Sequence, residues 1–204
     1  MTSRTRTDLL ATLARTSPII FMVVLFLFCL LDQSYYSYYF FIVYIIVVII
    51  NWIAKTLIFK PIYNYLGVDI LPILGLGSRP KNGNIGIDTY NCDFIFSNDS
   101  NDIITQSFGM PSGHSQIAWA IATYIICKVL KKIIKHWINK NYKQSLLLLF
   151  LIIIVISIAT YISYSRVYIE NCHTIQQVIV GGIIGIICGL LIYYYENKII
   201  RALY

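Results

Sequence analysis

Long apolar runs separated by short polar stretches make up most of this sequence. The runs cover about residues 9–31, 37–59, 114–130, 146–162 and 174–195. Each is close to the roughly 20 residues that an α-helix needs to cross the hydrocarbon core of a bilayer. The pattern therefore predicts an all-α fold, a polytopic membrane helix bundle with about five transmembrane helices.

Composition agrees with a membrane protein. Only 12% of the 204 residues are charged and the mean hydropathy is +0.71, whereas soluble domains carry about 25% charged residues. We expect one integral membrane domain over residues 1–204. The net charge is +7, but the basic residues are scattered in loops and at helix ends. This distribution favours contact with membrane lipids and a phosphate, and argues against nucleic acid as a partner.

Residues 60–113 break the apolar pattern and are rich in Gly, Asn, Asp and Ser. They predict a long polar loop between the second and third spans, and loops of this length usually have a function or act as a lid. Alternating spans place this loop on the same side of the membrane as the end of spans two and four and the start of spans three and five. The polar residues gathered on that side are Lys55, Arg79, Ser112, Gly113, His114, Arg166, His173 and Gln177. Polar residues at span ends usually have a functional reason, so this side predicts one site.

The lysine distribution predicts which side that is. Six lysines lie between residues 128 and 143, on the opposite side: Lys128, Lys131, Lys132, Lys135, Lys140 and Lys143. The positive-inside bias makes their side cytoplasmic, so the site faces a lumen or the exterior. A possible glycosylation sequon at Asn98 agrees with this orientation, whereas the basic N-terminus, with Arg4 and Arg6, argues against it.

The third run begins with a motif suited to phosphate. Residues 109–116 read Gly-Met-Pro-Ser-Gly-His-Ser-Gln. Ser112 is placed to cap the helix, Gly113 lets the backbone approach an anion, and the helix N-terminus favours negative charge. His114, in the first turn, can then give a proton to a leaving oxygen. An ordinary helix start beside a solvated histidine would produce the same pattern.

A second polar motif joins the fourth and fifth runs. Residues 164–168 read Tyr-Ser-Arg-Val-Tyr, followed by His173-Thr174 and Gln177. Arg166 offers a bidentate fork for phosphate oxygens. His173 can act as a nucleophile, and Gln177 lies one helical turn further on the same face. The alternative is an interfacial arginine that snorkels and a histidine that satisfies a helix end.

Together the two motifs resemble the second and third signature motifs of the type 2 phosphatidic acid phosphatase/haloperoxidase superfamily, P-S-G-H and S-R-x5-H-x3-D. The similar core covers about residues 51–195, and the motifs look most like the dolichyldiphosphatase branch, which has Gln in place of the last Asp. The resemblance implies that His173 forms a phosphohistidine, that Gln177 orients it and that His114 protonates the leaving group. The phosphate ligands that it implies are Lys55, Arg79, Ser112, Gly113 and Arg166. It implies no metal and no cofactor.

Two departures from the superfamily pattern stand out. The spacing from Arg166 to His173 is one residue longer, so the connecting segment must bulge. The first motif, K-x6-R-P, is also broken: Arg79 is followed by proline, but Pro72 stands where the lysine is expected. We interpret this as an insertion between Lys55 and Arg79, with Lys60 as the alternative lysine.

The cysteines and glycines add structural predictions. Cys92 and Cys172 lie in loops on the site's side, which is oxidising if lumenal, so they form a possible disulfide; two unrelated free thiols are the alternative. No pair of Cys or His has metal-ligand spacing, so no metal is expected. Gly181, Gly185 and Gly189 repeat every four residues, which predicts a smooth stripe for close helix packing.

These observations predict a metal-independent membrane phosphatase. Its expected substrate is a lipid phosphate or diphosphate, with a polyprenyl (dolichyl) diphosphate first. The alternatives are a phosphatidic acid phosphatase of broad lipid specificity and a non-catalytic relative that binds lipid phosphates. The expected location is the endoplasmic reticulum or a related endomembrane, with the active site lumenal.

Overall fold

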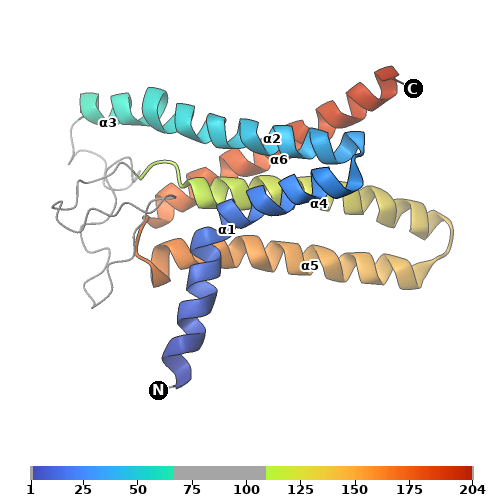
Figure 1. Ribbon diagram of the computed structural model, residues 1–204, viewed down its shortest axis with the longest axis horizontal. Coiled ribbons are helices and arrows are strands. Elements are labelled where there is room, and N and C mark those ends of the chain that lie inside the picture. Colours follow the sequence, from blue (N-terminus) through green and yellow to red (C-terminus); the bar gives the residue numbers. More distant parts are fainter. Residues whose placement is uncertain (1, 67–108, 204) are drawn as a thin grey trace.

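The computed structural model describes residues 2–66 and 109–203, with side chains described over 9–65 and 109–199. Within these ranges all regular elements are helical (Figure 1). They are α1 (Thr2–Asp32), α2 (Tyr35–Ile53), η1 (Ala54–Phe59), α3 (Lys60–Leu66), α4 (Gly113–Ile138), α5 (Tyr142–Tyr164), η3 (Ser165–Ile169) and α6 (Ile175–Leu203). The elements η1 and η3 are π-helical turns that continue α2 and α5. The predicted all-α class is confirmed.

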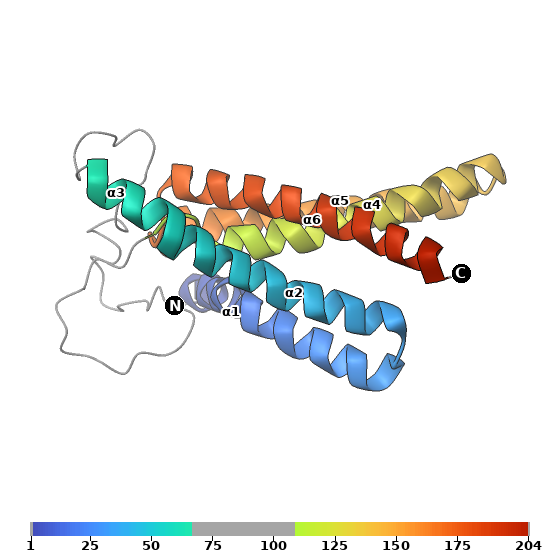
Figure 2. The same cartoon turned by 90° about the horizontal axis from the view of Figure 1, so that it is seen from above.

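Four helical stretches of the described chain are long and apolar enough to cross a membrane. They are Leu9–Asp32, Tyr35–Tyr65, Tyr142–Ile169 and Ile175–Ile199, and they contain the first, second, fourth and fifth predicted spans. The third predicted span lies in α4, which extends to Ile138. Helix α4 is central, because it packs against α5 and α6 and also contacts α1 and α2 (Figure 2). Since protein covers much of its surface, α4 can carry more polar residues than its neighbours.

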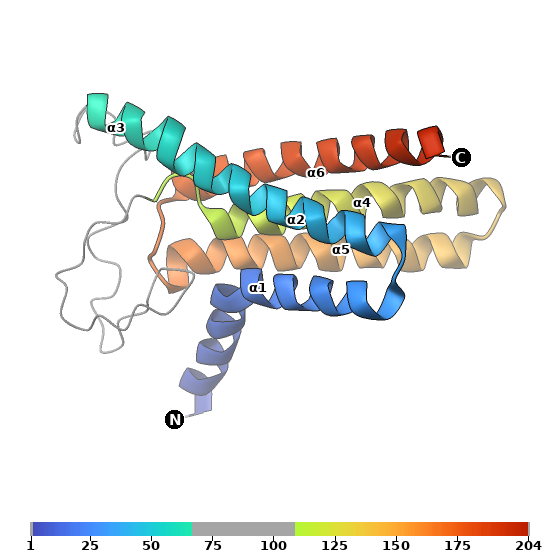
Figure 3. The ribbon, with the colours of Figure 1, turned by 45° about the horizontal axis from the view of Figure 1, so that its top comes forward.

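Helices α1 and α2 form a hairpin on one side of α4, and α1 is bent (Figure 3). The N-terminal part of α1 leans away from the bundle, and Pro18 lies within the helix. A proline has no N–H and clashes with the preceding turn, which accounts for the bend. The carbonyl of Ala14 loses its helical donor, and Ser17 Oγ donates to it instead at 2.7 Å.

A glycine stripe on α6 lies directly against the backbone of α4. A Cβ atom at Gly181 would lie 2.4 Å from the Ser112 carbonyl oxygen, and one at Gly185 would lie 2.3 Å from that of Gln116. Gly189 makes a similar approach one turn further on. Real Cβ atoms cannot come so close, so the smooth packing stripe predicted from sequence is confirmed, and it fixes the N-terminal ends of α4 and α6 together.

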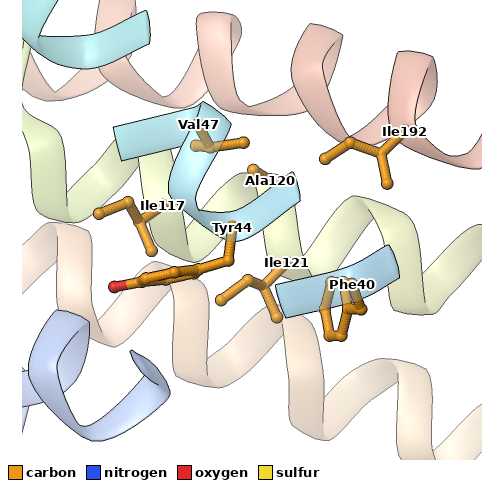
Figure 4. A pocket seen from close by; sticks show the side chains of 7 residues that line it. All are labelled: Phe40, Tyr44, Val47, Ile117, Ala120, Ile121 and Ile192. Atoms are coloured by element: carbon orange, nitrogen blue, oxygen red, sulfur yellow. The ribbon is translucent and has the colours of Figure 1, made fainter. Parts of the chain in front are cut away.

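A small apolar pocket lies between α2, α4 and α6 (Figure 4). Its lining residues are Phe40, Tyr44, Val47, Ile117, Ala120, Ile121 and Ile192. The lining contains no charged side chain, so this pocket is not a phosphate site. It belongs to the apolar core that joins the three helices.

A buried acid holds the other end of the α4–α6 pair together. Glu196 is 0% exposed and accepts from the Tyr124 hydroxyl at 2.9 Å and from Lys128 Nζ at 2.7 Å. Lys128 also lies over the Tyr36 ring of α2, 4.9 Å from its centroid. This cluster ties three helices together at the end of the bundle that carries the lysine-rich segment.

Candidate active site

The first motif forms the N-terminus of α4 and is almost entirely buried. Ser112 occupies the predicted cap position, with extended backbone (φ −69°, ψ 115°), but its side chain makes no capping hydrogen bond. Instead its backbone N–H donates to the Gln177 carbonyl at 3.0 Å, and its carbonyl accepts from Gln116 N. Within the described chain the Ser112 hydroxyl is a buried polar group with no hydrogen-bond partner. A buried polar group without a partner calls for an explanation, and one explanation is that it binds a ligand. The Ser112 hydroxyl is placed to donate to a bound anion.

Gly113 brings α2 against the first turn of α4. A Cβ atom there would lie 2.9 Å from Asn51 Oδ1, and Asn51 Nδ2 donates to Gln116 Oε1 at 2.8 Å. Gln116 in turn donates to the Val47 carbonyl at 3.2 Å. Asn51 and Gln116 therefore hold the part of α2 that precedes Lys55 against α4. The sequence alone did not indicate this role for Gln116.

His114 is buried, which excludes the alternative of a solvated histidine. It is 5% exposed, and its Nε2 lies 2.7 Å from the backbone carbonyl oxygen of Arg15 in α1. A carbonyl can only accept, so Nε2 donates and carries a proton. Arg15 lies three residues before Pro18, in the part of α1 that the proline distorts. Sequence reasoning did not connect α1 to the site.

Arg166 is 0% exposed, which excludes the alternative of a snorkelling arginine. Its Nη1 is paired with the carboxylate of Glu170, which is 1% exposed. Burial raises the pKa of the Glu170 carboxyl above its usual value, while the charges of Arg166 and then Arg15 act in the opposite direction. Glu170 therefore joins the site as a residue that the motif comparison had not identified.

The extra residue between Arg166 and His173 is absorbed in the π turn η3. The turn closes with a hydrogen bond of 2.9 Å from Glu170 N to the Ser165 carbonyl, and Asn171 follows with a positive φ of 51°. The amides of Cys172 and His173 then both donate to the Arg166 carbonyl, at 3.0 and 3.1 Å. The predicted bulge is thus a compact, hydrogen-bonded turn, and π turns of this kind often occur at functional sites.

His173 and Gln177 are joined through the cap of α6. Thr174 and Gln177 form a capping box: Gln177 N donates to Thr174 Oγ1, and Thr174 N donates to Gln177 Oε1, both at 3.3 Å. The same Oε1 atom lies 3.0 Å from His173 Nδ1. A backbone N–H can only donate, so this atom must be the amide oxygen, and it can only accept from the imidazole. The neutral His173 ring therefore carries its proton on Nδ1 and its lone pair on Nε2.

A continuous set of contacts links the two motifs. A Cβ atom at Gly109 would lie 2.3 Å from Gln177 Oε1, so this glycine is needed for Gln177 to occupy its position. The hydrogen bond from Ser112 N to the Gln177 carbonyl joins the start of α4 to the start of α6. On the other side, the Arg15 carbonyl contacts His114, and the charge of Arg15 acts to lower the pKa of the Glu170 carboxyl.

The remaining predicted site residues are only partly described. Lys55 lies half-buried in η1, one turn after Asn51, whereas Lys60 is exposed in α3. Arg79, Cys92 and the sequon residue Asn98 lie outside the described residues.

Cys172 is fully buried and disulfide-bonded, while Cys29, Cys127 and Cys188 are free thiols. The pairing of Cys172 with Cys92 therefore stays a prediction. Among described residues, no group of three or more His, Cys, Asp or Glu could hold a metal ion.

Fold and site together define a polytopic helical membrane protein with buried, polarised histidines at the starts of two helices and a buried arginine between them. Residues 52–201 match the sequence model of the PAP2 superfamily. The chain belongs to this superfamily.

Three relatives of the chain are named as dolichyldiphosphatases. The chain is 33% identical over 103 residues to "Dolichyldiphosphatase" of Saccharomyces cerevisiae, a match covering 50% of this chain and 39% of the relative. It is 34% identical over 96 residues to "Dolichyldiphosphatase 1" of Dictyostelium discoideum, covering 47% and 39%. It is 30% identical over 98 residues to "Dolichyldiphosphatase 1" of Homo sapiens, covering 48% and 40%. The chain thus spans about two fifths of the length of these relatives. No solved structure matches it.

Proposed function

We propose that this protein is a membrane lipid phosphatase that hydrolyses a polyprenyl diphosphate, such as dolichyl diphosphate, through a phosphohistidine intermediate. The observation that carries the proposal is the contact between His173 Nδ1 and Gln177 Oε1 at 3.0 Å, with Thr174 N on the same oxygen. It leaves a lone pair on Nε2, the atom that must attack phosphorus. The three relatives named dolichyldiphosphatase favour this substrate class.

Phosphate binding is the first step of the proposed reaction. The N-terminus of α4 offers backbone N–H groups and a positive dipole end, and the Ser112 hydroxyl and the Arg166 guanidinium lie at the same end of the bundle. Lys55 adds a positive charge from η1, and it is a better candidate than Lys60 because it is half-buried beside the site. Arg79 is the remaining proposed phosphate ligand. Together these groups neutralise the charge of a terminal phosphate.

Two chemical steps follow. His173 Nε2 forms a bond to the terminal phosphorus while the bond to the bridging oxygen breaks, and the lipid monophosphate leaves with a proton from His114. His114 holds this proton on Nε2 against the Arg15 carbonyl, and the leaving oxygen replaces that carbonyl as the acceptor. Water then attacks the phosphohistidine while the bond between phosphorus and His173 Nε2 breaks; the water gives a proton to His114, inorganic phosphate leaves, and the Nε2 lone pair of His173 is restored. Gln177 accepts from the His173 ring throughout but, unlike an aspartate, adds no charge to stabilise the imidazolium. None of these steps requires a metal ion.

The proposed location is an endomembrane with the site facing the lumen. Residues 128–143, which carry the six lysines, lie at the end of α4 and the start of α5, at the opposite end of these helices from His114 and Arg166. The positive-inside bias makes that end cytoplasmic. The disulfide of Cys172 suits an oxidising lumen.

The test is phosphate release by purified full-length protein from a lipid panel, with magnesium and with a chelator. We expect release from polyprenyl diphosphate to exceed that from phosphatidic acid, to be unchanged by the chelator, and to disappear in His173→Ala. Preference for phosphatidic acid would support the broad lipid phosphatase instead. Absence of release from every lipid would support a non-catalytic relative that binds lipid phosphates.

A further inference from the structure

The ion pair between Glu170 and Arg166 lies wholly inside the protein. Both side chains are at most 1% exposed, and the carboxylate contacts Nη1 of the guanidinium. Burying a charge is strongly unfavourable unless a counter-charge accompanies it. Glu170 therefore supplies a counter-charge to the arginine that the proposed function assigns to phosphate.

The local backbone makes this pairing specific. The π turn η3 brings Glu170 back towards Arg166, and its N–H bonds to the Ser165 carbonyl at 2.9 Å. The backbone of Arg166 is fixed from the same segment, because the Cys172 and His173 amides both donate to its carbonyl. The carboxylate and these two amides thus hold the side chain and the carbonyl of Arg166 just before the proposed nucleophile, His173.

We propose that Glu170 is a positioning residue: it holds Nη1 of Arg166 so that the guanidinium keeps one orientation towards a phosphate bound beside His173. This inference rests on the proposed function. A guanidinium has three nitrogens, so pairing of Nη1 with Glu170 is compatible with contact between another nitrogen and a phosphate oxygen. Because a fixed fork loses less conformational freedom when it binds, orientation increases phosphate affinity.

Arg15 connects α1 to this pair. Its charge acts on the Glu170 carboxylate, and its carbonyl accepts from His114. Arg15 also compensates for the negative charge that Glu170 brings to the site, so that the group of Arg15, Arg166 and Glu170 keeps a net positive charge for an anionic ligand. The competing explanation is an ion pair that serves only folding, and the two explanations predict different effects on phosphate affinity.

The experiment measures the affinity of the purified full-length protein for inorganic phosphate. The readout is the rise of the unfolding temperature with phosphate concentration at constant ionic strength, which needs no turnover. The variants are Glu170→Ala, Glu170→Gln and, as a matched control, Glu196→Gln. Glu196 is also a buried, ion-paired glutamate, but it lies at the other end of the bundle with Lys128.

We expect Glu170→Ala to weaken phosphate binding by about tenfold to a hundredfold, the effect of one hydrogen bond to a charged group. Glu170→Gln keeps an oxygen that accepts from Nη1 and should bind phosphate at least as tightly as the wild type. Glu196→Gln should lower the unfolding temperature and leave phosphate affinity unchanged. This combination separates positioning of Arg166 from a general loss of stability.

Three results would overturn the inference while the proposed function stands. The first is phosphate binding in Glu170→Ala that is unchanged or tighter than in the wild type. The second is binding in Glu170→Gln that is as weak as in Glu170→Ala. The third is a loss of phosphate affinity in Glu196→Gln as large as the loss in Glu170→Ala. Failure of the wild type to bind phosphate would instead overturn the proposed function, and this inference with it.

Discussion

Gln177 combines two roles that depend on one atom. Its Oε1 accepts from the Thr174 backbone and so caps α6, and it also accepts from Nδ1 of His173. Because Gln177 is 0% exposed and Gly109 lies directly against it, the amide has little freedom to rotate. Glutamine at this position is therefore explained by helix capping as well as by orientation of the imidazole.

The first prediction separates these two roles. Gln177→Leu removes both acceptor contacts, and we expect kcat to fall by about a hundredfold because the His173 ring loses its tautomer and its orientation. Gln177→Glu keeps both contacts and adds a charge that stabilises the imidazolium, so kcat should be retained or raised. Thr174→Ala, the control, removes only the hydroxyl half of the cap and should cost about 1 kcal/mol of stability with little change in kcat. Equal kcat in Gln177→Leu and Thr174→Ala would contradict this role for Gln177.

The second prediction concerns the two buried histidines. His173→Ala should abolish turnover and the labelled phosphoenzyme trapped by acid quench, because no nucleophile remains. His114→Ala should still form the phosphoenzyme but turn over about a hundredfold more slowly or worse, since proton donation is lost. His136→Ala, in the lysine-rich segment, is the control and should behave as wild type. A phosphoenzyme in His173→Ala would rule out the proposed nucleophile.

At the scale of helices, the site depends on how closely three elements approach α4. The glycine stripe lets α6 contact the α4 backbone, small side chains let α1 approach, and the π turn η3 redirects the chain from α5 into α6. Each of these features sets the position of at least one proposed site residue. Changes in helix packing should therefore alter catalysis even where they touch no phosphate ligand.

The third prediction tests the seam between α4 and α6. Gly181→Ala places a Cβ atom 2.4 Å from the Ser112 carbonyl, so the helices must separate and the Ser112–Gln177 backbone bond must lengthen. We expect a loss of about 1–3 kcal/mol in stability, typical of overpacking, together with reduced kcat. In the neighbouring control, Gly182→Ala, the new Cβ meets side chains rather than backbone, Trp119 at 3.2 Å and Ser115 Oγ at 3.4 Å, and should be tolerated better. Thermal unfolding and phosphate release measure both effects, and similar behaviour of the two variants would show that the seam does not set the site.

The fourth prediction tests the contribution of α1. Ala14 is 3% exposed and packs in a cluster with Ala118 and Ala122 of α4. Ala14→Leu should push α1 outward, move the Arg15 carbonyl away from His114 and lower kcat, with a stability loss of about 1–3 kcal/mol. Leu10→Phe adds bulk at an exposed position, 48% exposed, and should leave kcat unchanged. If Ala14→Leu loses stability but keeps kcat, the carbonyl of Arg15 does not serve His114.

Across the whole molecule, polar clusters occupy the two ends of the bundle and apolar side chains lie between them. One end carries the site, and the other carries the buried Glu196 with Lys128 and Tyr124. Large apolar side chains cover the outward surfaces of α1, α2, α5 and α6, as expected for helices that face lipid. We therefore expect changes at the Glu196 end of the bundle to alter stability without altering catalysis.

The fifth prediction uses that separation. Lys128→Met leaves the Glu196 carboxylate buried without its cation and should destabilise the protein by about 3 kcal/mol. This is the lower end of the cost of breaking a buried ion pair, because the Lys128 side chain is 31% exposed. Adding Glu196→Leu should recover much of that loss. Both variants should keep the KM of the wild type, measured on the folded fraction. A changed KM would show that the two ends of the bundle are coupled.

The sequence by itself determined the helical membrane fold, because apolar runs of span length can satisfy their backbone in lipid only as helices. It also located both motifs at helix ends, since glycine, proline and polar residues interrupt apolar runs there. The glycine stripe was readable because its four-residue spacing places all its members on one helix face. The spans, the motifs at their ends and the glycine stripe all follow from the spacing of residues close together in the sequence.

Only the tertiary structure decided which partners these residues have. The Arg15 carbonyl on His114, the Asn51–Gln116 bond and the Lys128–Glu196 pair join residues far apart in the chain, and nothing in their spacing specifies such contacts. Glu170 and Arg166 have the four-residue spacing of an ordinary helical ion pair, but that spacing does not reveal that both side chains are buried. The Ser112 hydroxyl was expected to cap α4, but it makes no capping hydrogen bond. The backbone N–H of Ser112 donates to the Gln177 carbonyl, an acceptor that only the close packing of α6 supplies.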